Sequence, residues 1–452
     1  MKTQKSGKVE QSIDNNKRNG IKSPIKSNTK NTQRSFKKSN IEGRRKAMRE
    51  VITDSRKIGD VISFFSRTTD EIVTLEELKR TLESGRQLVM KYGVDVTAPD
   101  IHIGHAVNLW MYRKLQELGH KVVFLIGDFT TQIGDPTGKN KTRPIIPLAE
   151  IQRNADAFIK QAEMILHTEP EVLEVRRNSE WLTELSAREL LNLMSMVTND
   201  KLIAREMFRQ RIAKGEEIYE HELIYPILQG YDSVILGSDL TIIGSDQLYN
   251  EMMGRAYQVK FGKKPQIIIT TKITPGIDGK GKQSKSVGNY ISLLHSPREK
   301  FGRIMSMPDN LVTQYFQVYT EVPLDEIAVM EDEYSDNLME YKLRLAKEIV
   351  RRYHGGEIAE GEYEWFKKTF SKREVPDDAP RISIGAAEAS IYRILRQCFP
   401  TEKSNGDIKR LIIQRAVTVS GNTVTDPEEK IRLTPEGIQI KAGKRTWFIV
   451  VP

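Results

Sequence analysis

The chain has 452 residues, 38% apolar and 29% charged, a composition typical of a globular protein with room for two or three domains. No apolar run approaches the roughly 18 residues that a membrane-spanning helix needs. The single cysteine, Cys398, excludes a disulfide framework. We therefore expect a cytoplasmic protein in a reducing compartment, without a membrane segment.

Residues 1–48 are expected to form a disordered basic tail. Residues 1–40 contain eleven Lys or Arg and two acidic residues, which accounts for the whole net charge of +9 and leaves the rest of the chain neutral. The tail has few apolar side chains, so burial cannot offset the entropy of ordering it. It would attract polyanions without specificity. Import into an organelle is an alternative role, although the Lys-rich sequence has no amphipathic pattern.

Short helices are expected over residues 49–84, followed by a strand–helix–strand unit. Residues 87–95 and 120–128 have the apolar runs of buried strands, and residues 104–119 between them carry apolar side chains at helical spacing. Such a unit forms parallel strands and binds ligands at their carboxyl ends.

Two further strands are expected at residues 240–244 and 266–271, with helices between residues 147 and 258. Together these elements predict an α/β fold, a Rossmann-like doubly wound parallel-sheet domain over residues 85–293. The rest of the chain is predicted to divide into three parts: an all-α domain over 294–375, a linker over 376–388 and a small α+β module over 389–452.

Two of the seven histidines, His102 and His105, flank one glycine in "HIGH", shortly after the first strand of the crossover unit. Free backbone N–H groups at a helix start favour an anion, and imidazoles can donate hydrogen bonds to it. The other histidines are scattered and no cysteine cluster accompanies them, so no metal site is expected. On their own the two histidines fit a core or capping role equally well.

Two loops rich in Gly and Lys follow later strands. The loop "IGDPTGKNKTRP" supplies Asp135, Lys139 and Arg143, and the loop "DGKGKQSKSVGN" supplies Lys282 and Lys285. Each alone could be a polar turn or a flexible exposed loop. Ammonium groups on a mobile loop could also stabilise the charge that develops on a pyrophosphate leaving group. The three motifs together indicate nucleotide chemistry.

These motifs resemble the "HIGH" and "KMSKS" signatures of class I aminoacyl-tRNA synthetases, and the second reads "KQSKS" here. With "IGDPTGK", "YPILQGYD" and "GSDQ", the chain from residue 85 onward resembles the bacterial-type tyrosyl-tRNA synthetases. The resemblance implies that tyrosine attacks the α-phosphate of ATP, giving tyrosyl-adenylate and pyrophosphate. The tyrosyl group then passes to the 3′ end of tRNA(Tyr) in protein synthesis. It also implies ATP accompanied by Mg²⁺, no protein-bound metal, and a homodimer that binds tRNA across both subunits.

The family pattern assigns the nucleotide-binding residues. His102 and His105 would contact the phosphates of ATP, and Asp246 the adenosine ribose, while Gly93 and Gly104 would let the nucleotide approach the backbone. In this family no side chain acts as a covalent nucleophile, which implies that catalysis is positioning and charge stabilisation. Four cations would hold the departing pyrophosphate: Lys139, Arg143, Lys282 and Lys285, the last also as an ATP ligand.

The same pattern assigns tyrosine recognition. Tyr225, Gln229 and Asp232 fall at i, i+4 and i+7, so one helical face would present all three, although a helix with a polar stripe is the alternative. A site built to hydrogen-bond a hydroxyl rejects phenylalanine by leaving a polar group unpaired, an effect for which this enzyme family is the known example. The implied ligands are Tyr225, Gln229 and Asp135 at the α-ammonium group, Gln247 at the carboxylate, Asp232 at the phenolic hydroxyl, and Asp95.

Two positions depart from the family pattern. Lys91 stands where many relatives have a tyrosine that touches the substrate hydroxyl, which would leave phenol recognition more to Asp232. A branch of bacterial enzymes also lacks that tyrosine. Gln283 replaces the methionine of the second signature and leaves both lysines in place, so only the packing of the loop would change.

The predicted helical domain would be of the anticodon-binding type. The last module resembles a small RNA-binding fold shared with a ribosomal protein, which in bacterial tyrosyl enzymes grips the long variable arm of the tRNA. Its basic side chains would contact phosphates, giving salt-dependent affinity without reading sequence, although on the residues alone a solvated charged face is as plausible. These side chains are Lys409, Arg410, Arg415, Lys441 and Lys444.

Three other functions compete with this one. The sister tryptophanyl enzyme shares the fold and motifs, but Asp232 and the C-terminal RNA module favour tyrosine. A small-molecule nucleotidyltransferase with an HxGH motif would need neither the lysine loop nor two appended domains. A non-catalytic RNA-binding relative would not require the paired histidines and lysines.

Overall fold

The computed structural model describes residues 50–137, 146–285, 287–371, 379–443 and 446–452. The basic tail predicted for residues 1–48 lies outside the described residues, as do Lys139, Arg143 and Lys444. Within the described ranges, no helix is both long and apolar enough to cross a membrane.

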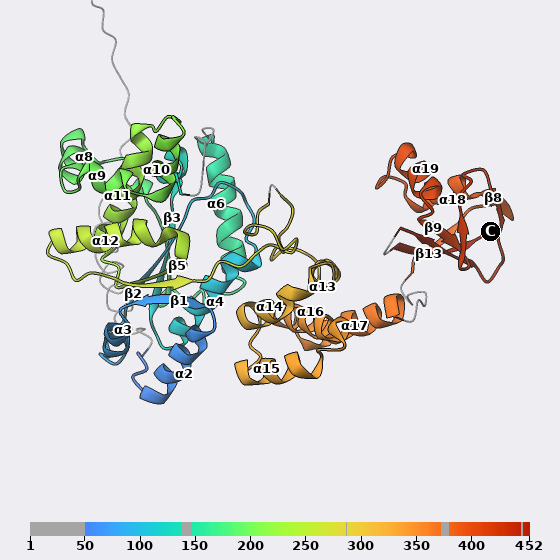
Figure 1. Ribbon diagram of the computed structural model, residues 1–452, viewed down its shortest axis with the longest axis horizontal. Coiled ribbons are helices and arrows are strands. Elements are labelled where there is room, and N and C mark those ends of the chain that lie inside the picture. Colours follow the sequence, from blue (N-terminus) through green and yellow to red (C-terminus); the bar gives the residue numbers. More distant parts are fainter. Residues whose placement is uncertain (1–49, 138–145, 286, 372–378, 444–445) are drawn as a thin grey trace, which may run out of the picture. The chain divides into compact units, whose positions relative to one another are not determined.

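A six-stranded sheet is the centre of the first large region (Figure 1). Its hydrogen-bonded order is β1-β6-β5-β2-β3-β4. Strands β2 to β6 run parallel, and β1 pairs antiparallel with β6. The predicted Rossmann-like sheet is therefore confirmed, with one antiparallel strand added at its edge. The strands are β1 (Thr69–Val73), β2 (Val89–Val94), β3 (Lys121–Ile126), β4 (Leu173–Arg177), β5 (Leu240–Gly244) and β6 (Ile267–Thr271).

Helices cover both faces of this sheet, with α2, α3 and α4 on one face and α11 and α12 on the other (Figure 1). The helices are α2 (Ser55–Ser66), α3 (Leu75–Leu82), α4 (Ile103–Glu117), α5 (Asp128–Ile133), α6 (Leu148–Ala162), α7 (Ser179–Leu182), α8 (Ala187–Met194), α9 (Asn199–Ile203), α10 (Glu206–Ala213), α11 (Glu220–Leu236), the 3-10 turn η1 (Ser245–Gln247) and α12 (Leu248–Lys260).

The apolar run of β3 explains why both faces are covered. Phe124 and Ile126 pack into the core that contains α4, whereas Leu125 packs against Trp181 and Leu228 on the opposite face. Successive side chains of a strand point to opposite faces, so a strand without polar alternation needs a cover on each side.

The chain changes direction across the sheet at β2. From β2 it continues outward through β3 and β4, and it then returns to the other side of β2 as β5 and β6. Sheets of this kind bind ligands in the crevice at such a switch point, beyond the carboxyl ends of the strands. Asp95 directly follows β2, and η1 directly follows β5.

Two strands differ from the sequence expectation. β1 lies between the two helices of the segment expected to contain helices alone, and β4 lies in a stretch expected to be helical. Both are edge strands with a single neighbour in the sheet. Each is only partly buried, so neither has the continuous apolar run that identifies a central strand.

A helical region follows the sheet. Its apolar core is continuous with the core on the α4 face of the sheet. Arg67, just after α2, donates to the carbonyls of Gln317 at 2.8 Å and Val322 at 2.9 Å, which ties α2 to this region. The helices are α13 (Pro297–Met305), η2 (Asp309–Leu311), α14 (Val312–Tyr319), α15 (Leu324–Glu333), α16 (Leu338–His354), α17 (Gly356–Phe366) and the π-helical turn η3 (Lys367–Ser371).

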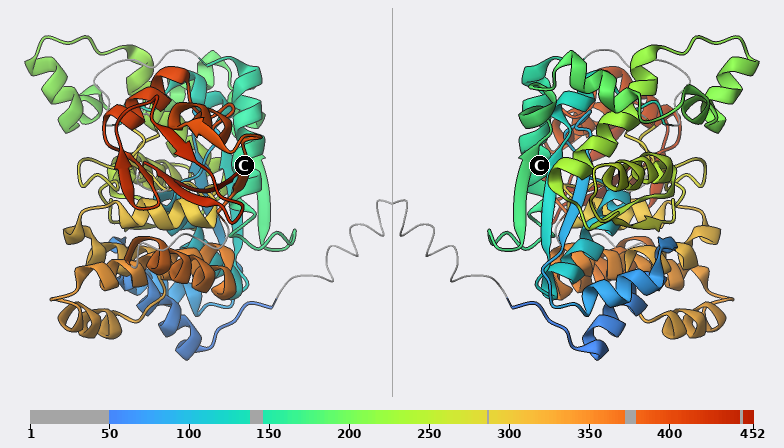
Figure 2. Two further views of the ribbon diagram at one scale, coloured as in Figure 1. Left: turned by 90° about the vertical axis from the view of Figure 1, so that its right-hand side faces the viewer. Right: turned by 90° about the vertical axis from the view of Figure 1, so that its left-hand side faces the viewer.

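The last residues form a small α+β module with a core of its own, drawn in red in Figure 2. Its sheets have the orders β10-β9-β12-β13-β7 and β11-β8. The elements are β7 (Arg381–Ser383), β8 (Glu388–Ser390), α18 (Ile391–Cys398), α19 (Asn405–Ile413), β9 (Val417–Val419), β10 (Asn422–Val424), β11 (Lys430–Arg432), β12 (Ile438–Ala442) and β13 (Thr446–Val451).

The segment predicted to be a linker, residues 376–388, contains the short strand β7. β7 pairs in parallel with β13, a strand at the far end of the module. β7 is thus held in place by pairing with a strand that is distant in the sequence. The predicted linker that contains it has a charged and proline-rich sequence.

Candidate active site

A cavity of about 550 Å³ lies at the switch point of the sheet. This volume is within the range of small-molecule sites. The lining contains every predicted catalytic, ATP-binding and tyrosine-binding residue that the structure describes: Gly93, Asp95, His102, Gly104, His105, Asp135, Tyr225, Gln229, Asp232, Asp246, Gln247, Lys282 and Lys285. The loop predicted to carry Lys139 and Arg143 reaches the cavity wall through Asp135 and Thr137.

The two histidines begin helix α4. The Gly104 N–H donates to His102 Nδ1 at 3.1 Å, and the His102 N–H donates to His105 Nδ1 at 3.4 Å. Because each Nδ1 accepts, each neutral ring carries its proton on Nε2, where it is a donor. A side chain at Gly104 would meet the His102 ring at 2.9 Å, so glycine is needed here for the histidine itself.

Both imidazoles are neutral near pH 7. Burial, followed by the Lys285 and Lys282 charges, lowers the pKa of His105 to about 4. Burial and the neighbouring His105 hold the pKa of His102 well below its usual range. Two neutral N–H donors at a helix N-terminus suit an anionic ligand, because they can donate hydrogen bonds to it and do not change protonation state near pH 7.

The "KQSKS" loop packs against the helical region through its departing residue. Gln283 is buried, its Nε2 donates to the Tyr319 hydroxyl at 2.7 Å, and its Oε1 accepts from the Ile291 N–H at 3.4 Å. Tyr319 lies on α14 and also bonds Thr274. A glutamine in the methionine position therefore gives this loop a polar anchor.

The lysines of this loop differ in exposure. Lys282 Nζ lies 3.1 Å from Asp246 Oδ2, and 59% of its side-chain surface is exposed. Lys285 is half-buried, and this burial lowers its pKa. The structure thus brings together Lys282, predicted to hold pyrophosphate, and Asp246, predicted to bind the ribose.

Asp232 lines the buried end of the cavity, which we call the closed end, and the residue is 3% exposed. Trp181 Nε1 donates to its Oδ1 at 2.8 Å and Asn178 Nδ2 to its Oδ2 at 3.3 Å. Burial raises the pKa of Asp232 to about 7, although the Lys91 charge and these two hydrogen bonds oppose the rise. This carboxylate is thus positioned to accept a further hydrogen bond from a ligand in the cavity.

Two further pairs connect the predicted tyrosine ligands. The Tyr225 hydroxyl donates to Asp95 Oδ2 at 3.0 Å, and Gln247 Nε2 donates to Asp135 Oδ2 at 2.7 Å. Burial and the nearby Asp95 charge raise the pKa of Tyr225 well above its usual range, so this phenol stays protonated. The carboxylates and donors form a polar wall along one side of the cavity.

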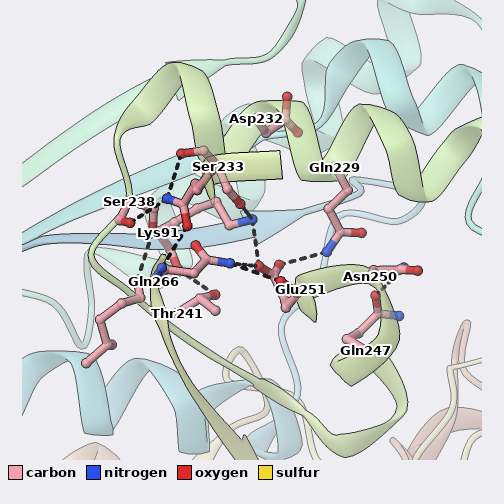
Figure 3. A network of polar contacts seen from close by, with 12 residues as sticks. Lys91, Gln229, Asp232, Ser233, Ser238, Thr241, Gln247, Asn250, Glu251 and Gln266 are labelled. Carbon is pink, nitrogen blue, oxygen red and sulfur yellow. Dashed lines mark hydrogen bonds and ion pairs between the residues drawn. The ribbon is translucent and has the colours of Figure 1, made fainter. Parts of the chain in front are cut away.

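Lys91 also lines the cavity, where it is held in a buried polar network (Figure 3). Its Nζ lies 2.9 Å from Glu251 Oε2 and donates to Ser233 Oγ at 2.7 Å. Gln229 Nε2 donates to the other carboxylate oxygen, Glu251 Oε1, at 2.8 Å. The residue that departs from the family pattern is therefore connected, through Glu251, to a predicted ligand of the substrate ammonium group.

Comparison with known proteins decides the family. The family described as "tRNA synthetases class I (W and Y)" matches residues 83–371. The tyrosine–tRNA ligase of Moorella thermoacetica is 40% identical over 398 residues, which cover 86% of this chain and 95% of the relative. The chain belongs to the tyrosine–tRNA ligase family. The ligase of Aquifex aeolicus, another member, is 40% identical over 383 residues, covering 85% of this chain and 96% of the relative.

Solved structures of tyrosyl-tRNA synthetases have the same fold. A C-terminally truncated mitochondrial enzyme from Coccidioides posadasii superposes with a TM-score of 0.55 at 21% identity, covering 74% of this chain and 99% of that one. The Archaeoglobus fulgidus enzyme, crystallised with L-tyrosine, superposes with a TM-score of 0.53 at 22% identity, covering 68% and 99% of the two chains.

Sequence reasoning missed three site residues of this ligase-family member. Trp181 and Asn178 bond Asp232 from the region after β4, and Glu251 bonds Lys91 and Gln229 from α12. The signal for Asn178 was its place directly after a strand, which the expected helix obscured. Glu251 lies four residues after "GSDQ", but its ion-pair partner, Lys91, is distant in the sequence, so no local pattern marks Glu251 as a site residue.

The predicted tRNA-binding residues of the C-terminal module have different surroundings. Lys409 is exposed on α19, and Arg415 is exposed just after the end of this helix. Lys409 Nζ lies 5.3 Å from the centre of the Tyr392 ring. Arg410 forms an ion pair with Asp407 on the same helix. Lys441 on β12 lies over the Trp447 ring at 5.1 Å.

Proposed function

We propose that this chain activates tyrosine with ATP and transfers the tyrosyl group to tRNA(Tyr). One observation carries the proposal: a single cavity joins the "HIGH" histidines and the "KQSKS" lysines to the polar face of α11 that ends in Asp232. The first set suits a triphosphate, and a buried carboxylate at the closed end suits a ligand with a hydroxyl at its tip.

The nucleotide end would work through charge and position. His102 and His105 would donate Nε2–H to phosphate oxygens, and Lys282 and Lys285 would stabilise the charge on the departing pyrophosphate. Asp246 would accept from the ribose hydroxyls, which requires that Lys282 leave it and move to the phosphates. Lys139 and Arg143, which lie outside the described residues, would join them at the phosphates. Gly93 would leave room for the nucleotide, because a Cβ atom at this position would have no neighbour closer than Leu125 Cδ2 at 3.9 Å.

The tyrosine end would work through hydrogen bonds. The substrate phenol would donate to Asp232, and its α-ammonium group would donate to Asp135, Tyr225 and Gln229. Gln247 would lie beside the carboxylate that attacks the α-phosphate, and Asp95 would orient Tyr225. Mg²⁺ would arrive with ATP and share the neutralisation of its phosphates.

We also propose a homodimer that binds tRNA across both subunits, with the helical region contacting the anticodon end. The basic side chains of the C-terminal module would contact tRNA phosphates: Lys409, Arg410, Arg415, Lys441 and Lys444. Sedimentation of the full chain checks the dimer, since a monomer at concentrations where the chain is active would contradict it.

The decisive experiment is amino-acid-dependent exchange of labelled pyrophosphate into ATP, run with tyrosine, tryptophan and phenylalanine. We expect exchange with tyrosine at far lower concentrations than with the other two. Exchange with tryptophan alone would assign the sister specificity, and absence of exchange with all three would favour a non-catalytic RNA-binding role.

Asp232→Ala tests the phenol contact. We expect the preference for tyrosine over phenylalanine to fall by at least tenfold, because the lost hydrogen bond involves a charged acceptor worth about 1.5–3 kcal/mol. The KM for ATP should change by less than about twofold, since Asp232 lies at the other end of the cavity. An unchanged preference would contradict the assigned role.

A further inference from the structure

We infer that Lys91 and Glu251 are positioning residues, a buried ion pair that orients the Gln229 amide so that its oxygen faces the substrate ammonium group. The inference rests on the proposed function and extends it to two residues that do not themselves need to touch the substrate. Figure 3 shows the network that carries it, which joins β2, α11 and α12. Lys91 and Glu251 both line the cavity, beside Gln229.

The ion pair is almost without solvent. The side chains of Lys91 and Glu251 are 1% and 3% exposed, and their charged atoms lie 2.9 Å apart. Removing two charges from water is costly, and burial is tolerated only where further hydrogen bonds satisfy both groups. Here Ser233 Oγ accepts from Lys91, and Gln266 Nε2 donates to Glu251 Oε2 at 2.6 Å. The pair therefore occupies a fixed geometry.

The ionised carboxylate determines which way the Gln229 amide faces. A carboxylate is an acceptor only, so the amide must turn its NH₂ group toward it. Gln229 Nε2 donates to Glu251 Oε1 at 2.8 Å, and in Figure 3 the amide oxygen is turned away from Glu251. Gln229 also lines the cavity.

An ammonium group has three donors and no acceptor. It can bond the Gln229 oxygen and would be repelled by the Gln229 NH₂ group. An amide free to rotate would present either end, so the carboxylate selects the end that binds an amine. Lys91 is needed because Glu251 without a cation would be an uncompensated buried charge.

The two charges also oppose each other at Asp232, where Lys91 lowers the pKa and Glu251 raises it. A single substitution would therefore change both the Gln229 amide and the ionisation of Asp232. Replacing both residues by methionine removes both effects and keeps side chains of similar length. Because the effect of Lys91 on Asp232 is larger than that of Glu251, a phenol ligand without an ammonium group is needed to report any change that remains at Asp232.

A second buried ion pair provides a matched control. Arg211 and Glu222 are 4% and 3% exposed, with Nη1 and Oε1 2.7 Å apart, and neither lines the cavity. Arg211→Met/Glu222→Met removes an equally buried pair without touching Gln229. Any loss caused only by weakened folding should appear in both double variants.

The experiment measures binding of three ligands to the full chain by calorimetry: tyrosine, tyramine, which keeps the ammonium group, and 3-(4-hydroxyphenyl)propionate, which lacks it. In the Lys91→Met/Glu251→Met variant we expect tyrosine and tyramine to bind roughly tenfold more weakly, the loss of about one charged hydrogen bond. The affinity for the propionate, which reports any change at Asp232, should fall by a clearly smaller factor than the affinity for tyramine, and the control variant should bind all three as the unmodified chain does.

Two results would overturn the inference in different ways. If the unmodified chain prefers tyrosine to phenylalanine but the double variant keeps its full preference for ligands with an ammonium group, the positioning role is wrong and the proposed function stands. If the unmodified chain shows no preference for tyrosine, the proposed function fails and the inference fails with it. A partial return of tyramine binding in Lys91→Met/Glu251→Gln would support the role, because the glutamine oxygen can again accept from Gln229.

Discussion

The two ends of the cavity are built in different ways. At the closed end, Asp232 and Lys91 are 3% and 1% exposed, and both have hydrogen-bond partners from other elements. At the open end, 59% of the Lys282 side chain and 33% of the Asp246 side chain are exposed. Lys285, also predicted for the open end, is half-buried, and the other two predicted cations, Lys139 and Arg143, lie outside the described residues.

This difference follows from what each end would have to recognise. Tyrosine differs from phenylalanine by a single hydroxyl group, so discrimination needs buried groups that are costly to leave unpaired. A triphosphate is recognised mainly by charge, and the charge that matters appears only as pyrophosphate leaves. Lysines on a Gly-rich loop, one exposed and one half-buried, can move to this charge, whereas a fixed buried network could not.

The largest effect should come from the open end. Lys285→Ala is expected to lower the rate of tyrosine-dependent pyrophosphate exchange by about 10²–10³-fold, the usual cost of removing one donor to a transition-state charge. The dissociation constant for tyrosine should stay within about twofold. Lys280→Ala is the matched control, since Lys280 is an exposed lysine of the same loop with no predicted ligand role. Equal losses in rate and in tyrosine affinity would show that the two ends are not separate.

The pH dependence of kcat/KM for tyrosine should also distinguish the two ends of the cavity, with a smaller effect than Lys285→Ala. The pKa of Asp232 is about 7, raised by burial, so this carboxylate is protonated as the pH falls through 7 and loses an acceptor site. We expect kcat/KM for tyrosine to fall about tenfold between pH 8 and pH 6. The histidines should add nothing in this range, since the pKa of His105 is about 4 and that of His102 is also low.

Two controls accompany the profile. Asp232→Asn should lower kcat/KM at pH 8 and remove the fall toward pH 6. Thermal unfolding distinguishes titration of the site from acid unfolding. Because the folded state raises the pKa of Asp232, it binds this proton more tightly than the unfolded state, so acidification through pH 7 stabilises the fold through this group. A melting temperature that drops in step with activity would contradict the assignment.

Motifs predicted the open end better than the closed one. The histidines, Lys282 and Asp246 could be placed from short signatures, because each signature lies in the segment that follows a strand of the sheet. At the closed end, Asp232 was assigned from the family resemblance, and helical spacing placed it on one face with Tyr225 and Gln229. Glu251 on α12 acquires its role only from Lys91 on β2, which lies beside it in the fold. Trp181 reaches Asp232 from beyond an edge strand that the sequence hardly marks. Contacts between distant segments are set by the tertiary fold, which no local pattern encodes.

The smallest effect should come from the C-terminal module, which has a core of its own. Lys409 is exposed on α19, so Lys409→Ala should weaken tRNA binding about uniformly across sequences and reduce the slope of log affinity against log salt by about 1, the expectation for one lost phosphate contact. Lys57→Ala, which removes an exposed lysine of α2 with no predicted RNA contact, should leave the slope unchanged.

Pyrophosphate exchange, which needs no tRNA, should be equal in both variants and the unmodified chain. A slope that does not respond to Lys409→Ala would mean that this lysine belongs to a solvated face, and a change in exchange would mean that the module acts on the cavity as well as on RNA.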